Sequence, residues 1–293
     1  MLGIATTLQK RIPTILLGFL IAYAIVLLTI RIFEARLIFF PEVSGRLEGE
    51  WNPPGLPVQD VWLRTSDGLK LHAWWIGADD ARFTFLAFHG NASNIANRAD
   101  IYKFLVALPA NVLAVEYRGY GRSEGYPSEK GVYRDAVAGL KYLEQTKGTD
   151  SRNIISYGQS LGSAVAAHLA AEHPVGGVVL EAPFPSLNAM ARKVFPFFPG
   201  AGVFVWRQFD TERALASIHT PVLVVHCTHD SVIPPEMEEA VFAAARPPKS
   251  ILRVNGYCHE EASLVAPEEY RDQLRAFLKK IDVSHNLQAT PKP

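Results

Sequence analysis

The stretch Ser156–Ser163 (SYGQSLGS) constrains the chain most, because it places a serine between two glycines. Residues 153–157 before it are predicted to form a short buried strand, and the small residues 163–170 after it a helix. G-x-S-x-G between a strand and a helix is typical of a turn that exposes the serine hydroxyl. The helix then offers unpaired N–H groups beside that hydroxyl. On its own the motif is weak, since an ordinary turn before a helix fits it equally well.

The composition excludes some classes of protein. The 293 residues include 29 basic and 29 acidic side chains, so no net positive charge or basic cluster attracts nucleic acid. With 48% hydrophobic residues, the chain can form one large globular domain. Two cysteines, Cys227 and Cys258, do not make a disulfide framework. We expect free thiols, although both lie near candidate catalytic residues and could be neighbours in space.

The N-terminal part contains 19 residues without charge, residues 12–30. A helix of that length spans about 28 Å, close to the thickness of the hydrocarbon core of a bilayer. We expect residues 1–36 to be an uncleaved membrane anchor; a signal peptide cleaved near Ala24 and a buried core helix are the disfavoured alternatives. The more positive N-terminal flank favours a cytoplasmic N-terminus and places the next domain on the non-cytoplasmic side.

Residues 37–283 are predicted to form the globular domain, followed by a short tail, residues 284–293. Two strand-like runs, 61–65 and 69–75, are joined by Ser-Asp-Gly, which indicates a hairpin. From residue 83 onward short apolar strands alternate with helices, the first of which is predicted over residues 95–107. This pattern predicts an α/β fold with a mostly parallel sheet covered by helices on both faces. Reactive groups in such sheets collect beyond the carboxyl ends of the strands.

Two later strands are followed by suitable partners for Ser160. Asp230 comes after an apolar strand, and His259 comes after the next one. A serine hydroxyl needs a base to take its proton, and the base needs an acid to orient it. The chain order Ser160, Asp230, His259 is the one expected after a nucleophile elbow. We therefore predict a catalytic triad of these three residues, with Glu181 as a second candidate for the acid.

The oxyanion hole is predicted to consist of two backbone N–H groups. One belongs to Leu161, directly after the serine. The other belongs to Asn91, in the loop that follows an early central strand, with Ala92 as the alternative.

The remaining histidines are expected to be structural. His226 and His229 lie near Cys227 and Asp230, which could suggest a metal site. No second ligand cluster with a familiar spacing accompanies them, so we predict no metal and no cofactor.

Four pieces of the sequence together resemble the α/β-hydrolase superfamily. They are Phe88–Ala92 (FHGNA), Glu116–Gly125 (EYRGYGRSEG), Gly158–Gly162 (GQSLG), and the pair Asp230 and His259. More narrowly, residues 37–281 are similar to the membrane-anchored serine hydrolases related to the eukaryotic protein depalmitoylases and their bacterial relatives. The resemblance implies the α/β-hydrolase fold and a cofactor-independent serine mechanism. It implies no particular substrate, because this fold hosts many. One departure is Glu116, where these relatives commonly have Asp.

A lid is predicted at residues 184–213, which are rich in aromatic side chains. Phe184, Phe195 and Trp206 are the candidates for a wall that binds an acyl chain, or for a surface that meets the bilayer. The alternative is a short helix that simply packs on the core.

These features predict a membrane-anchored serine hydrolase that cleaves a carboxylic ester or thioester through an acyl-enzyme intermediate. The expected partners are a small-molecule or lipidic acyl substrate and the membrane, and no nucleic acid. A serine peptidase or amidase with the same triad and a non-catalytic binding module remain the alternatives. The sequence makes no prediction of the oligomeric state.

Overall fold

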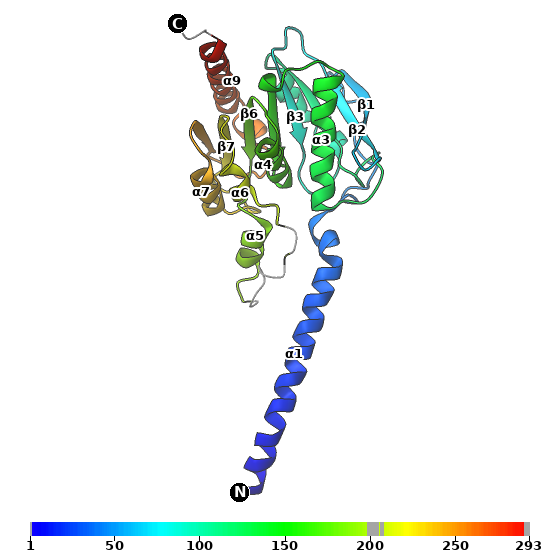
Figure 1. Cartoon of the computed structure of the whole chain (residues 1–293), viewed down its shortest axis with the longest axis vertical. Coiled ribbons are helices and arrows are strands. Elements are labelled where there is room, and N and C mark those ends of the chain that lie inside the picture. Colours follow the sequence, from blue (N-terminus) through cyan, green and yellow to red (C-terminus); the bar gives the residue numbers. More distant parts are fainter. Residues whose placement is uncertain (1, 198–204, 206–207, 290–293) are drawn as a thin grey trace.

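An eight-stranded sheet lies at the centre of the globular domain, in the order β1-β2-β4-β3-β5-β6-β7-β8 (Figure 1). The computed structural model of the chain describes residues 2–197, 205 and 208–289, and the side chains of those between 13 and 282. The strands are β1 (Val58–Arg64), β2 (Lys70–Ile76), β3 (Phe83–Phe88), β4 (Ala110–Val115), β5 (Ile154–Gln159), β6 (Gly177–Glu181), β7 (Val222–Cys227) and β8 (Lys249–Val254).

The sheet is antiparallel at one edge and parallel elsewhere. β1 pairs with β2 in the predicted hairpin, and β2 pairs antiparallel with β4. All other neighbours are parallel. β3, β5 and β7 are buried along their whole length, as their continuous apolar sequences predict. The predicted α/β-hydrolase fold is confirmed.

Helices cover both faces of this sheet. One hydrophobic core joins the sheet to α3, α4, α6 and α7, and a second core joins its other face to α2 and α9. After β3, the helices along the chain are η1 (Ile95–Asn97), α2 (Ala99–Val106), α3 (Glu129–Gln145), η2 (Ser151–Asn153), α4 (Leu161–Glu172), α5 (Leu187–Val194), α6 (Thr211–Leu215), α7 (Pro235–Ala244), α8 (Ala262–Val265) and α9 (Pro267–Ala289).

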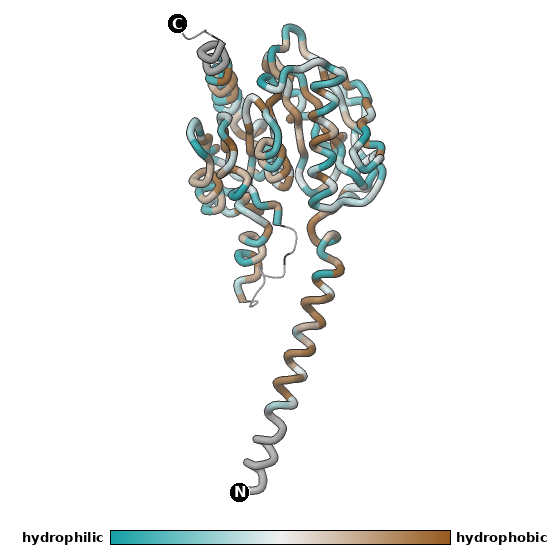
Figure 2. Tube along the Cα trace, viewed as in Figure 1, coloured by the Kyte–Doolittle hydropathy of each residue, from teal (hydrophilic) through white to brown (hydrophobic). Residues whose placement is uncertain are grey.

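The N-terminal helix α1 (Leu2–Ile38) extends away from the domain (Figure 1). It continues past the predicted end at residue 30, because the charged residues that follow do not interrupt its hydrogen bonding. Phe39 still donates its N–H to the carbonyl of Ala35, and Pro41 follows. The segment Pro13–Ile38 is long and apolar enough to cross a membrane (Figure 2).

One predicted helix is divided in two. The sequence suggests a single helix over residues 95–107, whereas the structure has η1, then Arg98 with φ −124°, then α2. Asn94 caps the first piece, and its amide group also donates to the carbonyls of Arg46 and Glu48. These contacts between distant segments fix the loop after β3, which matters for the site described next.

Candidate active site

Ser160 lies in a sharp turn between β5 and α4. Its φ of 50° and ψ of −115° fall in a region that residues other than glycine rarely adopt. Its N–H donates to the carbonyl of Glu181 at 2.9 Å, which ties the turn to the end of β6. The hydroxyl of Ser163 donates to the carbonyl of Ser160 at 2.6 Å. These bonds hold the strained turn in place.

The two glycines of the motif allow this turn to pack closely. A Cβ on Gly158 would lie 2.0 Å from the carbonyl oxygen of Gly162. A Cβ on Gly162 would lie 2.1 Å from the carbonyl oxygen of Phe88, at the end of β3. Both contacts are with backbone atoms, which cannot rotate away. The pattern G-x-S-x-G is therefore a packing requirement of the strand–turn–helix unit.

The structure brings Ser160, Asp230 and His259 together. The Nε2 atom of His259 lies 2.9 Å from the Oγ atom of Ser160, and its Nδ1 atom lies 2.7 Å from the Oδ2 atom of Asp230. The other carboxylate oxygen of Asp230 accepts from the backbone N–H groups of Val232 and Ile233, at 2.7 and 2.9 Å. The acid is thus fixed by its own loop, and the imidazole connects it to the hydroxyl.

Asp230 and His259 each shift the pKa of the other toward its charged form. Burial lowers the pKa of His259, but the hydrogen bond and negative charge of Asp230, together with the negative charges of Glu260 and Glu261, raise it by more, so that its pKa lies above its usual value. Burial raises the pKa of Asp230, but the hydrogen bond and charge of His259, with the two backbone N–H groups, outweigh that effect and lower it. Asp230 is therefore ionised when His259 takes a proton.

Cys227 and Cys258 form a disulfide, so the expectation of free thiols is wrong. Their Cα atoms lie 5.6 Å apart although 31 residues separate them in the sequence. Cys227 ends β7 and pairs in register with Val254 of the neighbouring strand β8, so the loops after both strands start side by side. One loop carries Asp230 and the other carries His259. The disulfide therefore connects the acid loop to the base loop.

One predicted oxyanion donor, Leu161, directly follows the serine, and the other, Asn91, lies in the loop after β3. Leu161 is the first residue of α4, so its N–H has no acceptor within the helix. Asn91 is held by its other groups: its carbonyl accepts from the N–H of Phe40 and the hydroxyl of Tyr120, and its side chain donates to the carbonyl of Ile38. Ala92, the alternative donor, pairs with Phe40 in an isolated β-bridge.

Sequence reasoning missed these supports of Asn91. Ile38 and Phe40 lie about 50 positions earlier in the chain, at the end of α1, and nothing in their local pattern indicates contact with a loop after β3. Tyr120 belongs to the glycine-rich stretch already noted, which is the one signal that could have pointed to it.

Glu181, the second candidate acid, has other partners. Its side chain accepts from the hydroxyls of Tyr157 and Tyr270, the amide of Gln159 and the backbone N–H of Ala262. Burial raises its pKa to about 7, and these hydrogen bonds offset part of that effect. The ring of His259 is hydrogen-bonded to Asp230 and not to Glu181. The hydrogen bonds of Glu181 therefore favour a structural role, in the core next to the turn of Ser160.

The other histidines near the site are also engaged. His226 is buried, and its ring is hydrogen-bonded to the carbonyl of Ile233 at 3.0 Å. The ring of His229 stacks on Tyr257, with ring centroids 4.6 Å apart. Within the described part of the chain, no three His, Cys, Asp or Glu side chains lie close enough to hold a metal ion.

The lid candidates differ in their surroundings. Phe184 is buried in the core with Phe209, which favours a packing role for it. Phe195 is 59% exposed and lines an apolar cavity. Trp206 lies outside the described residues.

Comparison with known proteins gives related hydrolases. Residues 79–204 match the family model described as serine aminopeptidase, S33. The alpha/beta hydrolase domain-containing protein WAV2 of Arabidopsis thaliana is 35% identical over 271 residues, which cover 85% of this chain and 88% of that protein. An uncharacterised protein of Mycobacterium tuberculosis is 34% identical over 257 residues, which cover 85% of this chain and 89% of that protein.

Two solved structures extend the comparison to three dimensions. An esterase of Pyrococcus furiosus superposes with a TM-score of 0.68 at 25% identity, over 83% of this chain and 98% of that one. An alpha-beta hydrolase of Vibrio vulnificus gives a TM-score of 0.64 at 28% identity, over 75% of this chain and 80% of that one.

Proposed function

Because this chain belongs to the α/β-hydrolase family, we propose that it is a serine hydrolase which cleaves carboxylic esters or thioesters with an apolar acyl group. The observation that carries the proposal is the continuous hydrogen-bonded row from Asp230 through His259 to Ser160. The solved esterase among its structural neighbours supports ester hydrolysis as the reaction.

The geometry supports a two-step mechanism. His259 takes the proton of Ser160 as the Oγ atom attacks the carbonyl carbon, and Asp230 stabilises the imidazolium that forms. The backbone N–H groups of Leu161 and Asn91 bind the oxyanion of the tetrahedral intermediate. His259 then gives the proton to the leaving alcohol or thiol. In the second step His259 activates a water molecule, which releases the acyl group as a carboxylic acid and restores Ser160.

We propose that α1 anchors the enzyme in a membrane with the hydrolase domain on the non-cytoplasmic side. The length and hydropathy of Pro13–Ile38 support the anchor. The disulfide between Cys227 and Cys258 supports an oxidising compartment for the domain, which agrees with the positive N-terminal flank.

Labelling with a fluorophosphonate probe tests the serine mechanism. Full-length protein in detergent should react at Ser160, and Ser160→Ala should abolish the label. The substitution should also lower p-nitrophenyl butyrate hydrolysis by about 10³-fold or more. Ser66→Ala, in the exposed β1–β2 turn, is the matched control and should behave as wild type. Absence of labelling in folded wild-type protein, or equal labelling of Ser160→Ala, would overturn the proposal.

A second substrate series separates the esterase from the amidase. The family description of serine aminopeptidase makes aminoacyl p-nitroanilides the relevant comparison. Preferential cleavage of these amides over p-nitrophenyl esters would replace the ester proposal by the amidase alternative while leaving the triad assignment intact.

A further inference from the structure

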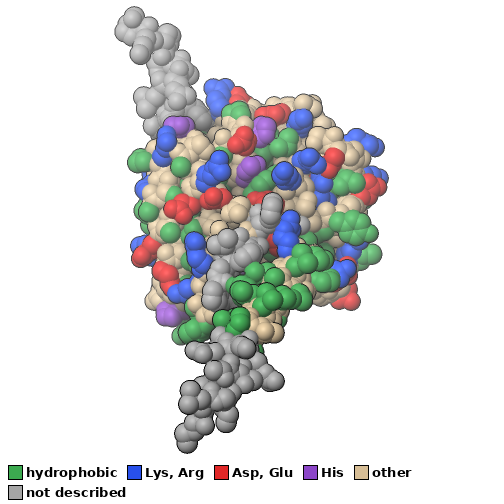
Figure 3. Space-filling view, turned by 60° about the horizontal axis from the view of Figure 1, so that its bottom comes forward, with side chains coloured by type: hydrophobic (Ala, Val, Ile, Leu, Met, Phe, Trp, Pro, Cys, Tyr) green, Lys and Arg blue, Asp and Glu red, His purple; other side chains and the backbone are tan. Residues whose placement is uncertain are grey.

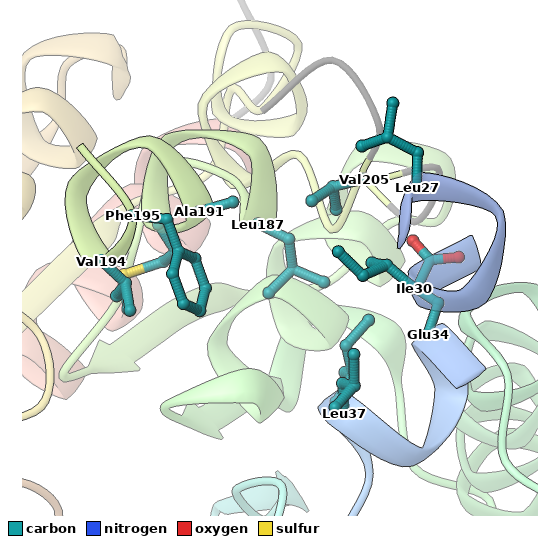
Figure 4. Close-up of a pocket in the computed structure, with 11 residues that line it drawn as sticks. Leu27, Ile30, Glu34, Leu37, Leu187, Ala191, Val194, Phe195 and Val205 are labelled. Carbon is teal, nitrogen blue, oxygen red and sulfur yellow. The ribbon is translucent and has the colours of Figure 1, made fainter. Parts of the chain in front are cut away.

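A cavity of about 400 Å³ lies between the last turns of α1 and the lid helix α5 (Figure 4). On the α1 side its lining includes Leu27, Ile30 and Leu37, and on the lid side Leu187, Ala191 and Phe195. In Figure 4 the side chains of Ile30 and Leu187 point toward each other across it. We call this space the anchor–lid cavity. Its walls come from two segments that are about 150 residues apart in the sequence.

One face of α1 is turned toward the lid. Leu27, Ile30, Glu34 and Ile38 recur at the spacing of a helical face, and all four are less exposed than residues on the other sides, such as Ile32, which is 66% exposed. Glu34, the acidic residue of the lining, forms an ion pair with Arg31 at 3.2 Å. Leu27 and Ile30 belong to the segment that can cross a membrane. The cavity therefore extends along the apolar span itself.

The domain end of the anchor–lid cavity lies between elements that flank Ser160. Ile38, which lines it, accepts a hydrogen bond at 3.0 Å from the side chain of Asn91 in the oxyanion loop. On the lid side, the chain reaches Leu187 from the end of β6, where Glu181 accepts the N–H of Ser160. The domain end of the cavity is thus joined, through Ile38 and through the end of β6, to the two segments that support the turn of Ser160.

We propose that the anchor–lid cavity binds the acyl chain of a membrane lipid ester, so that the anchor helix forms one wall of the acyl site. This inference rests on the proposed function and assigns its substrate class. The lipid keeps its chain between α1 and α5 while its ester carbonyl reaches Ser160. Because α1 lies in the bilayer along the same face, the chain slides into the site without crossing water.

The size of the cavity suits an acyl chain. Apolar ligand sites commonly have volumes of about 300–1,000 Å³, and the anchor–lid cavity, at about 400 Å³, falls in this range. A single acyl chain is a narrow, flexible occupant that fits an apolar space of this size.

Exposed hydrophobic side chains at the end of α5 favour a lipid of the bilayer as the ligand. They are Val194, Phe195 and Phe197, which are 56%, 59% and 97% exposed. α5 projects from the same end of the domain as α1 (Figure 1), and hydrophobic side chains gather on this side of the molecule (Figure 3). Exposed aromatic and aliphatic side chains next to an anchor are suited to the membrane interface. The lid wall of the cavity is therefore in reach of the lipid as well.

Filling the cavity from each side tests the proposal. Ile30→Trp and Ala191→Trp place a large side chain in it from α1 and from α5, and Ile32→Trp is the matched control on the exposed face of α1. The full-length proteins are compared in phosphatidylcholine nanodiscs with p-nitrophenyl palmitate and p-nitrophenyl butyrate. The ratio of kcat/KM for palmitate over butyrate should fall about 10-fold or more in both filled variants, and stay within about 2-fold of wild type in the control.

Each other result overturns the acyl site. An unchanged ratio in both filled variants would show that the acyl chain lies elsewhere. An equal loss in Ile32→Trp would show that any bulky change in α1 has this effect. In both cases butyrate hydrolysis and fluorophosphonate labelling of Ser160 would leave the proposed function standing.

A binding measurement separates the two proposals completely. Full-length Ser160→Ala in nanodiscs is irradiated with a phosphatidylcholine that carries a diazirine in its acyl chain, and the adducts are mapped by mass spectrometry. Adducts on both walls of the cavity, reduced by Ile30→Trp and not by Ile32→Trp, are expected. Adducts spread evenly around α1, or links between two copies of α1 in place of lipid adducts, would overturn the acyl site whether or not the protein is a hydrolase.

Discussion

The proposed reaction depends on the transfer of one proton from the hydroxyl of Ser160 to His259. The Nε2 atom of His259 lies 2.9 Å from the Oγ atom of Ser160, and Asp230, 2.7 Å from the Nδ1 atom, stabilises the imidazolium that forms. Only neutral His259 can act as the base. The acidic limb of the pH profile of kcat/KM therefore reports the pKa of His259, which Asp230, with Glu260 and Glu261, raises above its usual value of about 6.5.

Replacing Asp230 by Asn tests this electrostatic balance. Without the negative charge, burial dominates and the pKa of His259 falls, so the acidic limb should move to lower pH. The rate should also drop by on the order of 10³- to 10⁴-fold, because the Asn amide can donate to Nδ1 and hold the ring in the tautomer whose Nε2 already carries a proton. Hydrolysis of p-nitrophenyl butyrate between pH 5 and 9 measures both effects. Asp79→Asn, in an exposed loop, should leave the profile in place, and an unshifted limb in Asp230→Asn would contradict the assignment.

A methyl group at Gly162 should damage both the fold and the site. The added Cβ would lie 2.1 Å from the carbonyl oxygen of Phe88 and 2.7 Å from that of His89, so the chain leading into the oxyanion loop must move. We expect a loss of about 1–3 kcal/mol in the free energy of unfolding, measured in urea, and a large loss of ester hydrolysis. The control is Gly77→Ala, where the nearest atom would lie at 3.7 Å. Equal stability and activity in the two variants would refute the packing argument.

At the scale of the elements, the disulfide joins the loops after β7 and β8. Removing it in Cys227→Ala/Cys258→Ala should lower the free energy of unfolding by about 2–4 kcal/mol, given the 31-residue separation of the two cysteines. Ester hydrolysis should fall too, because Asp230 and His259 lie in those loops and move more freely.

Chemical reduction of the disulfide in the wild-type protein tests the same effect on activity without a mutation. Dithiothreitol should lower its activity as two thiols appear in a thiol titration, and should leave the double variant unaffected. Full activity after complete reduction would mean that β7 and β8 alone hold the two loops.

The elements were also the part most readily predicted from the sequence. Strands such as β3 and β7 are buried on both faces, so their apolar runs identify them, and the nucleophile elbow locates β5 and α4. The order of Ser160, Asp230 and His259 then follows from the topology of the sheet. The supports of Asn91, the disulfide and the second wall of the cavity depend on contacts between distant segments. No local pattern encodes such contacts, so they required the structure.

At the scale of the whole molecule, a truncation series separates the roles of the N-terminal segment. Proteins beginning at residues 27, 37 and 41 are compared in detergent, with circular dichroism as the check of folding. The ratio of palmitate to butyrate hydrolysis should fall between the first and second, because the α1 wall of the cavity is lost.

Butyrate hydrolysis itself should fall between the second and third truncations. The last step removes Phe39, which is 3% exposed and packs on Phe209, and the hydrogen bond from Phe40 to Asn91. Equal butyrate activity in proteins beginning at residues 37 and 41 would show that the oxyanion loop keeps its conformation without them.

The helix α1 passes into the domain without a linker, since Phe39 and Phe40 directly after it are already bound to the domain. With α1 in a membrane, as proposed above, an enzyme mounted in this way has almost no reach and meets its substrate by lateral diffusion in two dimensions. Its turnover would then follow the mole fraction of the ester in the surrounding leaflet. Diluting the ester with inert lipid would slow the reaction, whereas adding more vesicles of the same composition would not speed it, because each enzyme molecule samples only the membrane in which it resides.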